Sequence, residues 1–102
     1  MYYVYMLRCE DNSIYTGITT NIQRRMDEHL KRSNKCAKYT RTHFAKEMES
    51  IWKTENRVLA SKLEYHIKKL NKQHKEEIIK DSNKLKQFLG EKIEDNLYKK
   101  IK

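Results

Sequence analysis

The sequence of 102 residues contains no proline, only two glycines and only two cysteines. Cys9 and Cys36 are too few for a disulfide framework, and neither belongs to a Cys-x-x-Cys pair, which argues against a disulfide-rich secreted protein and against a zinc site. No apolar run approaches the roughly 20 residues that cross a bilayer. The first residues also lack the charged and apolar regions of a signal peptide. We therefore predict a cytoplasmic protein without a membrane partner.

Positive charge is in excess, because 23 Lys and Arg residues stand against 14 Asp and Glu and give a net charge of +9. Seven of these cations and only two of the acids lie between Thr20 and Thr42. Such a concentration of positive charge favours a polyanionic partner, and we predict a nucleic acid. A basic surface without this function is the alternative. The length permits one domain with a modest core, which we expect to be a monomer.

Two short runs near the N-terminus have the composition of β-strands. Residues 2–9 and 14–19 are rich in aromatic and β-branched side chains, and the four turn-forming residues between them predict a hairpin. Gly17 lies inside the second strand, where a glycine usually marks a bulge or a close approach to the backbone, for example by a ligand. Alternation places two sets of side chains on opposite faces of the first strand: Tyr3, Tyr5, Leu7 and Cys9 on one, and Tyr2, Val4, Met6 and Arg8 on the other.

A helix is predicted to follow the hairpin. Thr20 and Gln23 fit a capping box, in which each side chain pairs with the backbone of the other residue. Arg25 and His29 are four residues apart and would lie on one flank of the helix, so tyrosines of the hairpin and cations of the helix are expected to face a common cleft. The apolar residues that would form the buried stripe recur at helical spacing: Ile22, Met26 and Leu30.

The next part of the chain predicts a loop, a strand and a helix. Residues 31–44 have no clear period and predict a loop. Residues 48–54 predict a third strand, although residues 46–50 also fit a helix. Asn56 can cap a second helix. The buried stripe of that helix would consist of Leu59, Leu63, Ile67 and Leu70.

Two further helices are predicted beyond His74. The first contains Ile78, Leu85 and Leu89 at helical spacing, and Gly90 is a natural stop. The second contains Ile93, Leu97 and Ile101. These segments either complete the core or form a docking surface for another protein. The candidate residues of such a surface are Leu85, Leu89, Ile93 and Leu97.

One set of residues resembles the signature of a known family. The set consists of Tyr3-Val4-Tyr5, Tyr15-Thr16-Gly17, Arg25, His29, the run Ala37-Lys38-Tyr39-Thr40-Arg41 and the helical Glu64. It resembles the GIY-YIG nuclease superfamily, and most closely its small stand-alone bacterial branch. The resemblance covers roughly residues 1–75 and implies an α/β fold in the order β-β-α-β-α, with a small three-stranded antiparallel sheet flanked by helices. We expect residues 76–102 to form a helical C-terminal extension packed on or beside this domain.

The resemblance also implies a chemistry, which is the hydrolysis of phosphodiester bonds by a metal-dependent endonuclease. Tyr5 would act as the base or orient the nucleophile, and Tyr15 and His29 would hold the water and relay its proton. Arg25 can grip the scissile phosphate with two hydrogen bonds. Glu64 is the expected ligand of Mg²⁺ or Mn²⁺, and Mg²⁺ needs few protein groups because it keeps most of its waters. We expect neighbouring cations to lower the pKa of the tyrosine that takes the proton.

Further residues are expected to bind the nucleic acid. Tyr39 would stack on a base between two cations that hold phosphates, and the alternative is a solvated loop with one packed tyrosine. No element for reading bases is identifiable, so we expect low sequence specificity and a single-stranded or structured substrate, with DNA favoured over RNA. The predicted set of contacts is Gly17, Arg24, Lys35, Lys38, Tyr39, Arg41 and Lys68.

Other interpretations of the same residues stay open. Aromatic side chains commonly fill small sheets, and Glu64 can simply pair with Lys68 four residues further on. The chain departs from the family pattern because no proline follows the run 37–41 and because Asn71 comes only seven residues after Glu64. A nucleic-acid-binding module of the same fold, with weak or absent catalysis, is therefore the alternative function.

Overall fold

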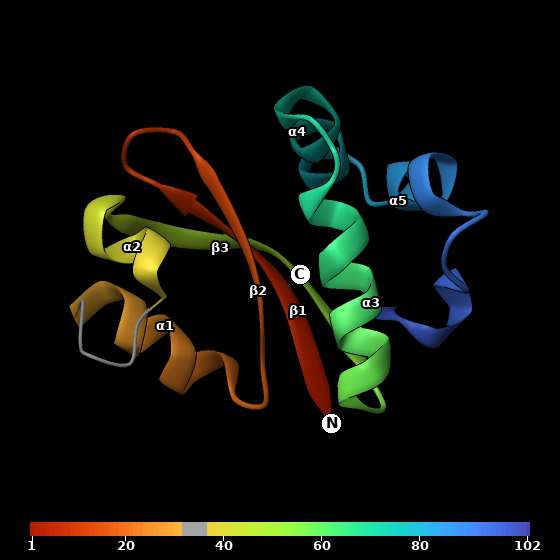
Figure 1. Cartoon of the computed structure of the whole chain (residues 1–102), viewed down its shortest axis with the longest axis horizontal. Helices are drawn as coiled ribbons and strands as arrows, with labels where there is room; N and C mark the ends of the chain where they lie inside the picture. Colours follow the sequence, from red (N-terminus) through yellow and green to blue (C-terminus); the bar gives the residue numbers. More distant parts are fainter. Residues whose placement is uncertain (32–36) are drawn as a thin grey trace.

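The N-terminal hairpin forms one half of a four-stranded antiparallel sheet. The computed structural model describes residues 1–31 and 37–102, and the strand order is β2-β1-β3-β4. Helices α1 and α2 lie on one side of the sheet, and α3, α4 and α5 lie on the other (Figure 1). In chain order the elements are β1 (Tyr2–Cys9), β2 (Ile14–Thr19), α1 (Ile22–Lys31), α2 (Lys38–Thr42), β3 (Ala45–Thr54), α3 (Arg57–Lys68), α4 (Lys72–Lys80), α5 (Asn83–Leu89), the 3₁₀ helix η1 (Asp95–Leu97) and β4 (Lys99–Lys100).

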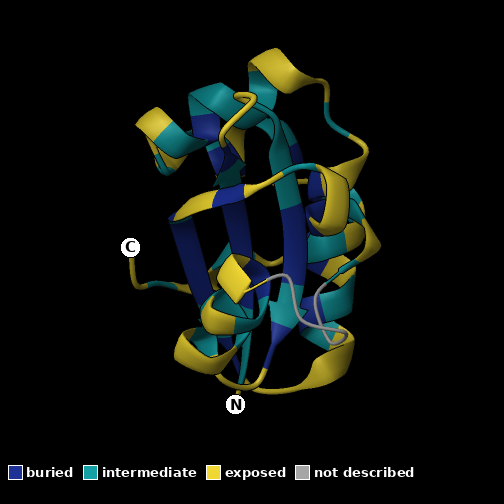
Figure 2. Cartoon of the chain, turned by 90° about the vertical axis from the view of Figure 1, so that its left-hand side faces the viewer, coloured by how far each residue is buried: buried dark blue, intermediate teal, exposed yellow. Residues whose placement is uncertain are grey.

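Strand β1 lies between β2 and β3, and both of its faces are buried because α1 packs on one side of the sheet and α3 on the other. Its alternation separates two apolar clusters, as the sequence predicts. Val4 and Met6 pack on the side of α3, whereas Tyr5 and Leu7 pack on the side of α1. The strands therefore form the most buried part of the molecule, and exposed residues concentrate on the surrounding helices and loops (Figure 2).

The predicted third strand is confirmed as β3, which begins earlier than expected, at Ala45. The helical alternative for residues 46–50 is wrong, because these residues pair with β1. The expectation of a structureless loop over residues 31–44 is wrong in part, because the short helix α2 forms within it. The four-residue turn of the hairpin is confirmed, and Asn12 takes a positive φ of 71° there.

Helix α1 differs from its prediction at both ends. Asn21, rather than Thr20, caps the helix, because the Asn21 side chain accepts a hydrogen bond of 3.0 Å from the Arg24 backbone N–H. Leu30, expected in the buried stripe, is 52 % exposed, and His29 is fully buried instead. A buried imidazole requires hydrogen-bond partners, and the following helix supplies one of them.

Helix α3 forms as predicted. The Asn56 side chain accepts a hydrogen bond of 2.9 Å from the Leu59 backbone N–H and so satisfies one of the free donors at the start of the helix. Leu63 and Ile67 are fully buried against the sheet, whereas Leu59 and Leu70 are partly buried at the ends of the stripe. The stripe predicted from the period of the sequence is therefore confirmed within the helix, whereas Leu70 lies beyond its last residue, Lys68.

The C-terminal segments complete the core on the side of α3. Leu85, Leu89 and Ile93 lie in the same cluster as Leu63 and are at most 4 % exposed. The hypothesis that they form a docking surface is therefore wrong, and of that candidate set only Leu97 remains exposed. The division of the chain into residues 1–75 and 76–102 stays a prediction.

The helix predicted from His74 to Gly90 is instead two helices, α4 and α5, with Asp81 and Ser82 between them.

Two further expectations about the end of the chain are wrong. The sheet has four strands rather than three, and residues 93–101 do not form an amphipathic helix. The free edge of β3 explains both differences, because exposed strand edges offer unpaired backbone groups. The Ile101 N–H donates a hydrogen bond of 2.8 Å to the Ile51 carbonyl, and β4 pairs with β3 just before it. Lys100 Nζ also lies 5.1 Å from the centroid of the Trp52 ring.

Helix α4 is tied to the sheet through Arg8 of β1. The Arg8 guanidinium donates hydrogen bonds to Glu76 of α4 and one of 3.0 Å to Glu49 of β3. Two carboxylates thus neutralise this cation, so it adds little to any positive surface. Within the described part of the chain, none of the helices combines the length and the apolar character needed to cross a membrane.

Replacing Leu85 with alanine should lower the free energy of unfolding by roughly 2–5 kcal/mol, because it removes a buried side chain and leaves a cavity. Leu97→Ala is the matched control and should cost less than about 1 kcal/mol, because that side chain is exposed. Urea-induced unfolding measures both changes. Equally small losses would contradict the burial of α5 in the core.

Candidate active site

Tyr5 and Gly17 are directly opposite each other in the pairing of β1 with β2. Opposed residues of an antiparallel pair point to the same face, so the phenol of Tyr5 lies over the glycine. A Cβ at position 17 would lie 2.5 Å from the Tyr5 hydroxyl oxygen and 2.7 Å from its Cζ. The close approach predicted at Gly17 therefore exists, but the group that approaches is Tyr5 rather than a ligand.

The Tyr5 hydroxyl begins a buried chain of hydrogen bonds. Tyr5 Oη lies 2.8 Å from His29 Nε2, and His29 Nδ1 lies 2.8 Å from Thr40 Oγ1. Thr40 Oγ1 donates its single proton to the Ala37 carbonyl at 3.1 Å, so it must accept from His29. The imidazole proton is therefore on Nδ1, and Nε2 accepts the proton of the Tyr5 hydroxyl.

Burial sets the protonation states of this pair. Neither Tyr5 nor His29 has solvent-exposed surface. Burial, together with the nearby charge of Arg25, lowers the pKa of His29 to about 4, so the imidazole is neutral at pH 7. Burial also raises the pKa of Tyr5 above its usual range and outweighs the opposing hydrogen bond from Arg25. The expectation that neighbouring cations lower the tyrosine pKa is therefore wrong for Tyr5 in the free protein.

Arg25 brings positive charge to the same hydroxyl. Its Nε donates a hydrogen bond of 3.3 Å to Tyr5 Oη, and its Nη1 pairs with Glu28 at 2.9 Å. The four-residue spacing of Arg25 and His29 thus directs both side chains to one oxygen. A guanidinium in this position can bind a phosphate through two parallel N–H groups.

Tyr15 is half-buried and lies between the buried pair and the surface. Its ring centroid is 6.2 Å from that of Tyr5 and 5.7 Å from that of His29. Lys68 Nζ, from α3, lies 5.4 Å from the centroid of the Tyr15 ring. Residues from both sides of the sheet therefore meet at this tyrosine.

Tyr39 stacks on other protein rings. Its centroid is 4.0 Å from that of His43, with 13° between the ring planes, and 5.5 Å from that of Tyr15. His43 Nδ1 in turn lies 2.6 Å from a carboxylate oxygen of Asp11. A base that stacked on Tyr39 would have to compete with these rings, which favours the alternative of a packed tyrosine.

Glu64 reaches the same region from α3, on the other side of the sheet. Because β2 is an edge strand, side chains of α3 can extend past it. Glu64 pairs with Lys68 at 3.4 Å, and Lys68 contacts Tyr15. The charge of Glu64 also contributes to the raised pKa of Tyr5. The Glu64 carboxylate is therefore within electrostatic reach of the Tyr5 hydroxyl. Its ion pair with Lys68 agrees with the alternative interpretation, in which Glu64 simply pairs with the lysine four residues further on.

The donor set around Glu64 fits a metal ion that is held only partly by protein. The Glu64 side chain is 22 % exposed. The described residues contain no group of three or more His, Cys, Asp or Glu that could hold an ion by themselves. Mg²⁺ keeps several waters and is usually bound by one or two carboxylates together with substrate phosphates. A single, partly exposed carboxylate such as Glu64 meets the protein's share of that requirement.

The other predicted contacts with nucleic acid are spread over the surface. Arg24, Lys38 and Arg41 are exposed, and Lys35 lies outside the described residues. Sequence reasoning missed Thr40 and Glu28 as parts of the site. The signal for Thr40 is its place in the run 37–41, and the signal for Glu28 is its three-residue spacing from Arg25.

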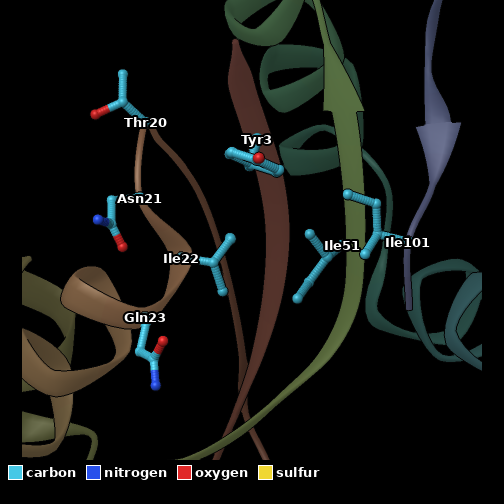
Figure 3. A pocket seen from close by; sticks show the side chains of 7 residues that line it. All are labelled: Tyr3, Thr20, Asn21, Ile22, Gln23, Ile51 and Ile101. Atoms are coloured by element: carbon cyan, nitrogen blue, oxygen red, sulfur yellow. The ribbon is translucent and has the colours of Figure 1, made fainter.

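A hollow on the side of α1 is separate from this centre. It has a volume of about 600 Å³ and lies between the start of α1, the sheet and the end of the chain (Figure 3). Its lining residues are Tyr3, Thr20, Asn21, Ile22, Gln23, Ile51 and Ile101. None of the predicted catalytic side chains is among them, so the candidate centre is the region around the β2 edge.

Known proteins are similar to this chain over most of its length. The family model described as GIY-YIG catalytic domain matches residues 1–80. The chain is 49 % identical over 78 residues to the UPF0213 protein FN1575 of Fusobacterium nucleatum, with 76 % of each chain covered. It is 34 % identical over 89 residues to the UPF0213 protein YhbQ of Salmonella arizonae, with 87 % of each chain covered. The solution NMR structure of the UPF0213 protein BH0048 from Bacillus halodurans is similar with a TM-score of 0.50 and 36 % identity, over 78 % of this chain and 84 % of that one.

Replacing Thr40 with valine should leave the Nδ1–H of His29 without an acceptor while keeping the shape of the side chain. A buried donor without a partner costs about 1–3 kcal/mol, and the free energy of unfolding should fall by that amount. Thr40→Ser keeps the hydroxyl and should recover most of the loss. Chemical denaturation measures both variants, and a valine variant as stable as the wild type would show that the hydroxyl does not bind His29.

Proposed function

Because this chain belongs to the GIY-YIG catalytic domain family, we propose that it is a metal-dependent endonuclease that hydrolyses phosphodiester bonds in DNA. One observation carries the proposal. The Tyr5 hydroxyl is hydrogen-bonded to the neutral imidazole of His29, accepts a hydrogen bond from the guanidinium of Arg25, and is within electrostatic reach of the Glu64 carboxylate. Hydrolysis of a phosphodiester needs an acceptor for a water proton and positive charge at the phosphoryl oxygens. These groups can meet both needs.

His29 would be the final acceptor of the proton. The attacking water gives a proton to Tyr5 Oη while Tyr5 passes its own proton to His29 Nε2. A new P–O bond forms to the water oxygen, and the P–O bond to the leaving oxygen breaks. The leaving oxygen departs with the bonding electron pair and takes a proton from solvent water, and His29 later returns its proton to solvent. Tyr5 then needs no lowered pKa, because it relays a proton without existing as a separate phenolate. The negative charge of a bound phosphate raises the pKa of His29 and makes it a better acceptor.

Arg25 would bind the scissile phosphate. In the free protein its guanidinium is shared between Tyr5 and Glu28. A phosphate offers two oxygens that match the guanidinium fork and can replace the carboxylate. Tyr5 has no exposed surface, so the proposed chemistry requires a movement that lets water reach the hydroxyl. Arg25 contacts that hydroxyl, and we propose that it is the side chain that moves.

Glu64 would hold the divalent metal ion, for which we propose Mg²⁺ or Mn²⁺. When bound, the ion supplies neutralisation of the phosphoryl charge and stabilisation of the departing oxygen. Lys68 would lose its partner Glu64 and turn towards the phosphate backbone beside Tyr15.

The proposed substrate is single-stranded or structured DNA, cut with low sequence specificity. Lys68 contacts Tyr15 at the candidate centre, and Arg24 lines the same hollow as Arg25. Such cations contact backbone phosphates rather than distinguish bases. The net charge of +9 supports a polyanionic partner of this kind. We also propose that the enzyme prefers DNA to RNA, is a monomer, lies in the cytoplasm and acts in DNA repair.

A nucleic-acid-binding module without useful catalysis is the second candidate. The complete burial of Tyr5 and His29 favours it, because a water molecule must reach the hydroxyl before it can be activated. Such a module would show binding that weakens with salt and no turnover that depends on metal.

Purified protein should cut DNA in the presence of Mg²⁺ and should not cut it in EDTA. Glu64→Gln removes the charge but keeps the shape, and it should lower the rate about 100-fold or more. Tyr5→Phe should lower it by about 10²–10⁴. Gel assays with labelled single-stranded, branched and duplex DNA, and with RNA, measure these rates.

Glu91→Gln is the matched control for Glu64→Gln, because Glu91 is an exposed acid just beyond α5. It should cut as fast as the wild type. Cleavage that survives both Glu64→Gln and Tyr5→Phe would refute the proposed mechanism. Binding without cleavage by the wild type would favour the second candidate.

A further inference from the structure

A hollow lined by three arginines lies at the end of β2, between α1 and α3. Its volume is about 300 Å³, and its arginines are Arg24 and Arg25 of α1 and Arg57 of α3. One carboxylate in the lining, that of Glu28, opposes the three guanidinium groups and is already paired with Arg25 at 2.9 Å. The hollow therefore carries a net positive charge.

Two of these arginines have few partners in the protein. Arg57 is exposed, and its guanidinium has no hydrogen bond or ion pair with any residue in the ranges 1–31 and 37–102. Arg24 Nη2 makes a hydrogen bond of 3.4 Å with the hydroxyl of Thr20. Each guanidinium offers five N–H donors, and clustered guanidinium groups repel one another. An anion with several acceptor oxygens complements such a cluster.

The hollow continues the candidate active site along one edge of the sheet. Arg57, Glu64 and Lys68 are spaced seven and four residues apart, which places them on one face of α3. Glu64 and Lys68 lie near the start of β2, whereas Arg57 lies near its end. Arg25 belongs to both regions, because it lines the hollow and contacts the Tyr5 hydroxyl. An extended polyanion on the β2 edge would therefore pass from one region to the other.

The spacing suits a second phosphate of the same strand. The seven residues from Arg57 to Glu64 span about 10 Å of helix. That length exceeds the roughly 3.4 Å that separates successive phosphates along the axis of one stacked strand. A phosphate in the hollow would therefore be a different phosphate of the same strand, up to about three nucleotides from the scissile phosphate.

We propose that this hollow binds a backbone phosphate that flanks the scissile bond, with Arg57 as its principal ligand and Arg24 in support. The inference rests on the proposed nuclease function for the identity of the strand. It does not depend on catalysis, because a phosphate can bind without being cut. Continuity with the candidate active site favours nucleic acid over an acidic peptide as the ligand.

Binding of a short single-stranded oligodeoxynucleotide in EDTA tests the proposal in the absence of cleavage. The dissociation constant is measured over a series of salt concentrations for the wild type, Arg57→Gln and Lys62→Gln. Lys62 is the matched control, because it is an exposed cation of α3 outside the lining of the hollow. Arg57→Gln should weaken binding roughly fivefold and reduce the salt slope by about 0.7. Lys62→Gln should change both much less.

A neutral linkage in the DNA locates the bound phosphate. Oligodeoxynucleotides that carry one methylphosphonate at successive positions remove one negative charge at a time. The wild type should lose affinity at a flanking position, and Arg57→Gln should show no further loss at that position. Arg57→Lys keeps the charge but loses the two-pronged geometry, so it should recover only part of the affinity.

Three results would overturn the proposal: equal effects of Arg57→Gln and Lys62→Gln, no binding of the oligonucleotide by the wild type, or tighter binding of a polyglutamate peptide than of the oligonucleotide. Binding that depends on Arg57 in a protein that does not cut would support the hollow and refute only the proposed hydrolysis. In a protein that cuts, Arg57→Gln should raise KM and leave kcat unchanged.

Discussion

The candidate site is organised by the hydrogen bond between the Tyr5 hydroxyl and the neutral imidazole of His29. The phenol fits only because Gly17, opposite it on β2, has no Cβ. The direction of the bond depends on Thr40, which gives its proton to a backbone carbonyl and accepts the Nδ1–H. The neutral state of the imidazole depends on burial, which deprives the charged form of hydration. The proton between Tyr5 and His29 is therefore positioned by four elements together: β1, β2, α1 and α2.

The two edges of the sheet are used differently. The C-terminal residues cover β3, where β4 pairs and the Ile101 N–H bonds to the Ile51 carbonyl. On the opposite edge, β2 has no further strand among the described residues, and charged side chains of α1 and α3 lie close to it. The C-terminal segments therefore complete the core and cover the β3 edge, whereas charged side chains gather at the β2 edge. This arrangement also brings Glu64, on one side of the sheet, within electrostatic reach of the Tyr5 phenol on the other side.

Local sequence patterns predicted the parts of the fold that local interactions decide. The hairpin, the Asn56 cap and the stripe of α3 depend on turn residues, capping and helical period within single segments. The burial of His29 in place of Leu30 was not predictable, because it depends on Thr40 in a segment without a period of its own. The pairing of β4 joins residues far apart in the sequence, and the raised pKa of Tyr5 follows from burial, so neither could be read from neighbouring residues.

Nitrogen-15 NMR of the His29 ring tests the central hydrogen bond most directly. In the free protein at pH 7 we expect a protonated Nδ1 and an unprotonated, hydrogen-bonded Nε2. We expect this state to persist as the pH is lowered, until the ring titrates with a pKa of about 4. A proton on Nε2 at pH 7, or a pKa near the ordinary value of about 6.5, would contradict the direction of the bond and the neutral acceptor on which the proposed chemistry depends.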